Sequence, residues 1–409
     1  MALPTRKVEL GLDLSAQGGP FFKLDDAVQG VLDNTTYLLG GSLFYDVTSY
    51  VKTLTTNRGR SRELDRYNTG SANITFTNQT RAFDPSYTAS PFWPSIQPRR
   101  EMRITIGGSA VYYGLVDDWN LDYQINGEST AGAVCVDGFA ILAKQNLSAF
   151  TAIAGQTTGA RIGTVLARSE VAWPSTLLSL DAGQQTLQAD VVAQDTNVLT
   201  YLQLVEQSEP GSFFISAAGS ATFKDRNTAA VVGTATFADD GSEIGYTDLQ
   251  VVYGTELLYN RVNITRAGGT VQTANYTPSQ DQYSISTLDE AGLLIDTDAN
   301  ALTLANYLLG KYQQAELRFD QLTVELSSLT TAQQATFLGL ELTNVITVKF
   351  TPNKVGSQVS QKCQIIGIAH DARPDSHKVT LKLAQTDGKV AFVLDSSAFG
   401  VLDASTLGF

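Results

Sequence analysis

The stretch MRITIGGSAVYYGLVDDWNLDY, residues 102–123, has the pattern of a strand, a Gly-Gly turn and a second, longer strand. Its apolar and polar residues alternate, which is typical of strands with one face in a protein core. The stretch VITVKFTPNKVGSQVSQKCQIIGIAHDARPD, residues 345–375, has the same plan, and each second strand carries Gly-x-x-x-Asp: Gly114 and Asp118, then Gly367 and Asp371. This echo predicts one antiparallel β-barrel used twice within the chain.

The rest of the sequence predicts a mainly β chain with an α+β insertion between the two related barrels. Most segments are rich in Thr, Val, Ile and Tyr, whereas apolar residues at helical spacing occur in 137–170 and 188–207. Another helix is expected from 297 to 315, capped by Asp298, with Leu302, Leu304, Tyr307 and Leu308 on its apolar face. Residues 225–245 are expected to be a loop, and the last 90 residues to be strand. We therefore predict four regions: a barrel in 1–140, a helical and hairpin region in 141–240, a strand-helix-strand segment in 241–330, and a barrel portion with a tail in 331–409.

One long connection, residues 81–103, combines prolines, aromatics and arginines in RAFDPSYTASPFWPSIQPRREMR. Its four prolines fix their own φ angles and favour extended neighbours, so the sequence predicts a stiff, ordered arm without ladder hydrogen bonds. The arm could bind sugars or bases by stacking, but a rigid arm that carries aromatics outward suits a protein interface equally well. We expect assembly contacts from Phe83, Tyr87, Phe92, Trp93, Arg99 and Arg100.

A second candidate surface lies in NRGRSRELDRY, residues 57–67. Arg58, Arg60 and Arg62 occupy alternate positions, so they share one face if the segment is extended. They could dock on an acidic protein surface, remain solvated beside the chain's own acids, or contact DNA. Arginine's planar fork suits interface ion pairs, so we expect assembly contacts here as well.

Charge and composition weigh against several classes of function. The 409-residue chain has a net charge of −13, which disfavours gripping nucleic acid through phosphates but suits a channel through which DNA slides. No apolar run is long enough to span a bilayer, and the charged N-terminus lacks a signal peptide's apolar segment. We expect a protein made in the cytoplasm, without a membrane span.

Catalytic and metal sites have little material in this sequence. Two cysteines lie in apolar runs, and the only histidines are His370 and His377, so no catalytic, metal or cofactor site is expected. Adjacent carboxylates such as Asp117 and Asp118 could serve in glycoside hydrolysis, but neighbours in a strand point to opposite faces. We expect the protein not to be an enzyme.

The order of several segments resembles the minor tail proteins of long-tailed, siphovirus-type phages, and among them the tail hub or baseplate hub family at the tail tip. The resemblance rests on RGRSREL, SANITFTNQTRAFDP, YYGLVDDW, NVLTYLQLVEQSEPGSFF, YNRVNITR, GIAHD and the C-terminal VLDSSAFGVLDASTLGF. It covers nearly the whole chain.

The resemblance implies a homotrimer whose subunits each carry two tail-tube-like barrels. Six similar units would then dock on a six-fold tail tube or distal tail ring while the hub itself is three-fold, closing the tube until DNA passes at infection. Implied partners are the distal ring or tail tube protein, the tape measure protein and other tail-tip proteins, and the implied location is the distal end of the tail. Two alternatives stay open: a hexameric distal tail ring protein, or a tail protein that binds or cleaves host glycans.

Overall fold

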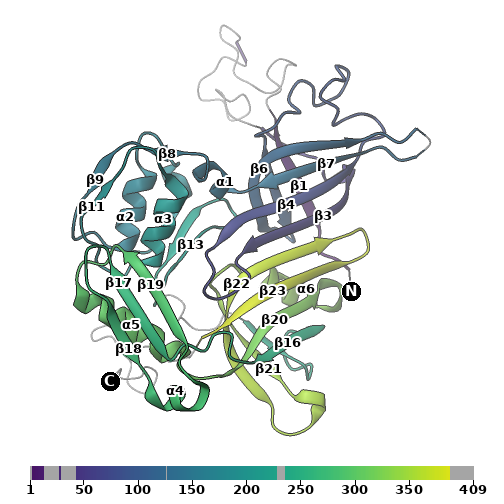
Figure 1. Cartoon of the computed structure of the whole chain (residues 1–409). Coiled ribbons are helices and arrows are strands. Elements are labelled where there is room, and N and C mark those ends of the chain that lie inside the picture. Colours follow the sequence, from purple (N-terminus) through teal and green to yellow (C-terminus); the bar gives the residue numbers. More distant parts are fainter. Residues whose placement is uncertain (1, 13–26, 29–42, 126, 228–234, 387–409) are drawn as a thin grey trace.

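The computed structural model describes residues 2–12, 27–28, 43–125, 127–227 and 235–386 (Figure 1). The C-terminal segment VLDSSAFGVLDASTLGF, residues 393–409, lies outside these residues. In the described part, the chain is mainly β, as predicted, and its largest element is a 13-stranded sheet. No closed ring of strands occurs within the described residues, so the two barrels stay a prediction.

The first half of the large sheet, here called the N-unit, is built from the first third of the chain. The six main strands of the N-unit follow one another in this order across the sheet: β3 Val51–Gly59, β4 Asn68–Thr77, β7 Thr130–Val136, β6 Ser109–Asp122, β5 Glu101–Ile106 and β1 Arg6–Leu12. The short strand β2, Leu43–Asp46, pairs with β1 at the outer edge of the N-unit.

The second half, the C-unit, is built from strands within residues 235–385 and has the same order of strands. When the six strands of each unit are numbered along the chain, both units place them in the order 2-3-6-5-4-1 across the sheet. The units differ in the direction of the first strand, because β1 is antiparallel to β5 whereas β15 is parallel to β21. The repeat expected from residues 102–123 and 345–375 is present as topology. Its strands are, in the matching order, β16 Asp248–Tyr253, β20 Leu317–Glu325, β23 His377–Gln385, β22 Val359–Ala372, β21 Val345–Phe350 and β15 Ala235–Ala238.

Equivalent strands also share their irregularities, although the two Gly-x-x-x-Asp motifs do not coincide. β6 and β22 each have 14 residues, and each has a register shift against its hairpin partner. The shift lies between Val116 and Asp118 in β6 and between Ile365 and Gly367 in β22. Gly114 comes before the register shift of β6, whereas Gly367 comes directly after the register shift of β22. The two units are therefore superposed by matching their register shifts and not by matching the two glycines.

The middle of the chain forms a body of helices and short strands beside the sheet, and its buried side chains belong to the same apolar core as those of the sheet (Figure 1). Three helices lie there: α1 Gly138–Leu142, α2 Thr158–Leu166 and α3 Val198–Gln207. The predicted hairpin is confirmed as β13 Ser212–Ile215 and β14 Ala221–Lys224, with β10 Leu178–Leu180 parallel to β14. Four short strands complete it: β8 Asn146–Leu147, β9 Phe150–Ala152, β11 Asp190–Val192 and β12 Thr196–Asn197.

A small module with its own apolar core follows within 257–312. It contains α4 Thr277–Tyr283, α5 Asp298–Tyr312, and the strands β17 Arg261–Arg266, β18 Gln272–Asn275 and β19 Thr287–Leu293. The helix expected in 297–315 is thus present, but its N-cap is Thr297, whose side chain accepts from the Asn300 amide. Leu304 and Leu308 are buried as expected, whereas Leu302 and Tyr307 are exposed.

Two expectations for the last part of the chain are wrong. The predicted loop 225–245 contains β15, and the predicted all-strand C-terminal region contains α6, Thr331–Leu338. α6 begins with a capping box between Thr330 and Gln333, a short polar signal that the strand-rich surroundings concealed. Of the helices in the described residues, none is long and apolar enough to cross a membrane.

Candidate assembly surfaces

The arm that connects β4 to β5 is a chain of tight turns. Amides of Arg81, Asp84, Tyr87, Ser90 and Trp93 each donate to the carbonyl three residues earlier. Asp84 fixes one turn by accepting from the Ser86 amide and hydroxyl, at 2.9 and 2.6 Å. The predicted absence of ladder hydrogen bonds holds for this series of turns, but the backbone turns rather than running extended as the prolines predicted. The end of the arm does join the sheet, because Arg99 and Arg100 bond to Val116 and β5 begins at Glu101.

Two of the arm's aromatics point inward. Phe83 is fully buried and stacks on Phe76 of β4 at 4.4 Å and on Trp119 of β6 at 5.8 Å. Phe92 is also buried, and its ring lies 5.4 Å from Phe83. These two side chains belong to the subunit's own core, so the expectation that the arm carries them outward is wrong.

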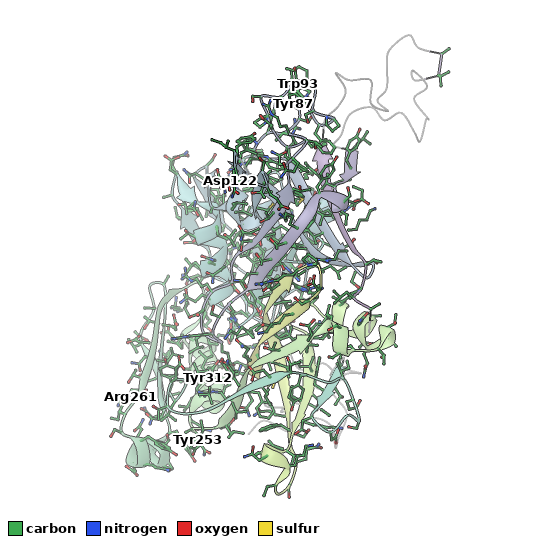
Figure 2. The ribbon with its side chains drawn as sticks, turned by 90° about the vertical axis from the view of Figure 1, so that its right-hand side faces the viewer. Tyr87, Trp93, Asp122, Tyr253, Arg261 and Tyr312 are labelled. Atoms are coloured by element: carbon green, nitrogen blue, oxygen red, sulfur yellow. The ribbon has the colours of Figure 1, made fainter. Side chains whose placement is uncertain are left out.

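The other arm residues remain accessible. Figure 2 shows Tyr87 and Trp93 at one end of the molecule, beyond Asp122. Arg81 lies over the Tyr87 ring at 4.6 Å, and Trp93 is half-buried. Arg99 is exposed with its guanidinium 3.9 Å from Asp117. The assembly prediction therefore stands on these outward groups and on the half-buried Arg100, which donates to the Ser95 carbonyl at 3.0 Å.

Arg58 lies where the two units meet rather than on a surface. It is buried, and its guanidinium forms an ion pair with Glu341 at 2.8 Å. Glu341 also accepts from the Ala217 amide at 2.8 Å, which ties the middle body to the same point. Arg58 is thus committed inside the subunit and does not belong to an external strip.

Arg60 and Arg62 do not share the face of Arg58, because β3 ends at Gly59, between Arg58 and Arg60. Gly59 has a φ of 104°, and residues after it turn away from the strand direction. Arg60 lies over the Tyr67 ring at 4.7 Å, whereas Arg62 forms an exposed ion pair with Glu256 at 3.0 Å. The one-face arrangement of the three arginines is therefore not present, and only Arg62 is prominently exposed.

Two buried carboxylic acids hold backbone amides in and beside the middle body. Asp137 accepts from the amides of Gly70 and Phe139 at 2.7 and 2.9 Å, and burial raises its pKa to about 7. Burial likewise raises the pKa of Glu206 to about 7, and its carboxyl accepts from the Phe213 amide at 2.8 Å. Both groups hold backbone amides, so their role is to fix the start of α1 and of β13.

The two histidines form a buried pair within the C-unit. Nδ1 of His370 lies 3.1 Å from Nε2 of His377, so one ring donates to the other. Burial lowers the pKa of both imidazoles, that of His377 to about 4. Both are neutral at pH 7 and pack within the hairpin of β22 and β23.

A cavity of about 180 Å³ lies between residues 60–66, the end of α3 and the small module. Two of its charged lining residues bind each other, since Glu63 forms an ion pair with Lys311, and Glu63 also accepts from the Tyr312 hydroxyl at 3.0 Å. Sequence reasoning missed this junction because its partners are far apart in the chain. Among the described residues, no three side chains that could ligate a metal come together.

Comparison of the sequence with known protein families and with curated proteins gives no match. Comparison of the fold gives matches. A tail protein from Neisseria meningitidis MC58 superposes with a TM-score of 0.57 at 11% identity, over 94% of this chain and 97% of that one. A 43 kDa tail protein of prophage MuSo2 from Shewanella oneidensis superposes with a TM-score of 0.54 at 12% identity, over 84% and 94%. The chain therefore has the fold of these tail proteins.

Proposed function

We propose that the chain is a structural subunit of a phage tail, the trimeric hub at the tail tip. The observation that carries the proposal is the repeat: one chain holds two units with the same strand order. Three such chains present six similar units, so a three-fold assembly can match a six-fold tube or distal ring. The similarity of fold to two tail proteins supports a role in a phage tail, and the repeat supports the hub among the possible tail proteins.

In this role the hub closes the tail tube before infection and lets DNA pass afterwards. The net charge of −13 suits that passage, because an acidic wall repels phosphates and keeps DNA from adhering. We assign the subunit no catalytic step. Its partners in the proposal are the tube or distal ring, the tape measure protein and other tip proteins.

Native mass spectrometry of the purified full-length chain tests the proposal. A hub gives an assembly of three copies of the 43.9 kDa chain. Six copies in one ring would instead identify a distal tail ring protein. Such a ring matches a six-fold tube with one unit per chain and does not require two. A protein that stays monomeric at all concentrations would contradict both assignments.

The glycan-binding alternative loses part of its support in the structure. Two of the aromatics that would stack on sugar rings, Phe83 and Phe92, are core residues. Incubation with host wall fragments separates the two proposals: bound protein or released sugar would favour the glycan role, and neither is expected for a hub.

A further inference from the structure

The two units of one chain are joined by a direct strand pair. The second half of β22 pairs antiparallel with β3, from Gly367 opposite Gly59 to Ala372 opposite Leu54. This half of β22 is available because β21 pairs only as far as Gln364. The junction therefore joins one edge strand to the free half of a long strand.

The equivalents of these two parts, one in each unit, each have one side without a strand partner within the described residues. β16 is the C-unit's equivalent of β3, and it pairs only with β20. β6 is the N-unit's equivalent of β22, and its pairing with β5 ends at Leu115. Val116 still bonds to the backbone of Arg99 and Arg100, so within the described residues the side of β6 that is free for another strand runs from Asp117 to Asp122.

These two parts lie too far apart to meet within one subunit. Figure 2 shows Asp122, at the end of β6, toward the upper end of the molecule and Tyr253, at the end of β16, toward its lower end. They also lie at separate places in one continuous sheet. A contact between them must join two copies, and it uses different surfaces on each, which is how rings form.

We propose that β16 of one subunit pairs antiparallel with the second half of β6 of the next copy, and that the contact repeats the junction of β3 with β22. The inference rests on the proposed hub, because it supplies the contacts that close three chains into a ring. It names the occupant of both edges as a second copy of this chain.

The intrachain junction also predicts the register. The register shifts of β6 and β22 align the two units, and counting from them across the ladders makes Leu249 equivalent to Leu54 and Tyr123 equivalent to Ala372. The ladder of β16 with β20 shifts after Gln250, so the residues from Val251 onward are counted along β16 itself. The predicted opposite pairs are then Leu249 with Tyr123, Gln250 with Asp122, Val251 with Leu121, Val252 with Asn120, Tyr253 with Trp119, and Gly254 with Asp118.

This register brings apolar side chains together on one face. Val251 is 36% exposed, Tyr253 is 67% exposed and Tyr123 is 49% exposed in the single subunit, which is unusual for large apolar groups at a sheet edge. In the predicted register, all three meet Leu or aromatic partners. Such cross-strand pairs stabilise a sheet.

The predicted register also places a glycine at the position equivalent to Gly59. A Cβ on Gly59 would lie 2.3 Å from the Ile366 carbonyl oxygen, so the intrachain junction requires glycine there. Gly254 falls at the equivalent position, yet a Cβ there would meet nothing within 4 Å in the single subunit. The next copy's strand supplies the missing neighbour.

A cysteine pair tests the contact. The Arg60 amide donates to the Ile366 carbonyl at 2.8 Å, which makes Asn57 and Ala369 a pair without mutual backbone hydrogen bonds, the kind with the closest side chains. Val252 and Asn120 are their equivalents, and the native Cys135 and Cys363 are buried. We expect mild oxidation of the Val252→Cys, Asn120→Cys double variant to give a covalent trimer on a non-reducing gel.

The control pair is Val252→Cys with Val191→Cys, because Val191 is well exposed on β11, which is not part of the large sheet. A trimer in which the first pair cross-links no better than this control would overturn the strand pairing and leave the hub standing. A covalent ring of six copies would keep the pairing and remove the trimeric hub. A monomer without cross-links would contradict both.

A substitution at Gly254 gives a second readout. A Cβ at Gly254 meets no atom within 4 Å in the subunit and its φ lies outside the left-handed region, so we expect Gly254→Val to leave the thermal unfolding of the isolated chain unchanged. We expect the concentration needed for half-assembly to rise at least tenfold. Gly245→Val is the matched control, because Gly245 has equally open surroundings and lies outside the strands. Equal assembly of both variants would contradict the proposed register.

Discussion

At the scale of single residues, Arg58 shows how far a local pattern can be interpreted. Its alternation with Arg60 and Arg62 indicated a shared face, and β3 is indeed extended up to Gly59. The sequence could not show that Arg58 points inward, because its partner Glu341 is 283 residues away. A buried arginine is stable only with such a partner, and that partner is set by the meeting of the two units.

Removing the charge of Glu341 should therefore weaken the fold. Glu341→Gln keeps the shape but leaves Arg58 as a buried, uncompensated charge, so we expect the free energy of unfolding to fall by roughly 3 kcal/mol. Urea denaturation of the purified chain measures it. Glu256→Gln, which breaks the exposed pair with Arg62, is the control and should cost less than about 1 kcal/mol. Equal effects of both variants would contradict a structural role for Arg58.

The histidine pair predicts a pH dependence of stability. His377 titrates near pH 6.5 in the unfolded chain but at about pH 4 in the folded one, because burial disfavours its charged form. The unfolded state therefore binds the proton first, and the free energy of unfolding decreases as pH falls from 6.5 to 4, by up to about 1.4 kcal/mol per pH unit.

Denaturation of the wild type and of His377→Gln across this range isolates the contribution. Asp137 and Glu206 act in the opposite direction, because their pKa is raised to about 7 and their folded forms bind protons first as pH falls. The difference between the two slopes is thus the relevant quantity. A variant with the wild-type slope would show that His377 is not buried in its neutral form.

At the scale of elements, the arm between β4 and β5 was predicted as an ordered segment with extended backbone and no ladder hydrogen bonds. Its turns make no ladder bonds, but they are not extended, and Arg99 and Arg100 at its end bond to Val116 of β6. The direction of its aromatics could not be predicted, since alternation has no meaning in a series of turns. Phe83 turns inward because Phe76 and Trp119 provide a stacking surface there, and Phe92 packs against Phe83. The candidate surface is reduced to the accessible part of the arm.

Alanine substitutions should separate these two groups. Phe83→Ala removes a core ring and should lower the free energy of unfolding by about 3 to 5 kcal/mol. The double variant Tyr87→Ala, Trp93→Ala should leave unfolding within about 1 kcal/mol of wild type and reduce binding to the partner ring or tube protein. Thermal unfolding and sedimentation with the partner measure the two effects. Unchanged partner binding would remove the arm from the assembly surface.

At the scale of the whole molecule, the sequence predicted a repeat and the structure describes it as a repeated strand order. The echo between residues 102–123 and 345–375 identified equivalent hairpins, because alternation and turn residues mark strands locally. It could not reveal that β3 pairs with β22, since pairing between distant segments leaves no periodic signal. The glycine match also gave a shifted alignment, which the paired bulges correct.

The repeat also gives the account its central claim, that three chains supply six similar β-units around one axis. A cryo-electron microscopy map of the assembled tail tip tests it most directly. We predict a three-fold ring in which N-units and C-units alternate, with β3 to β22 junctions inside chains and β16 to β6 junctions between them. A ring of six chains, or a trimer whose C-units lie away from the ring of N-units, would contradict the account.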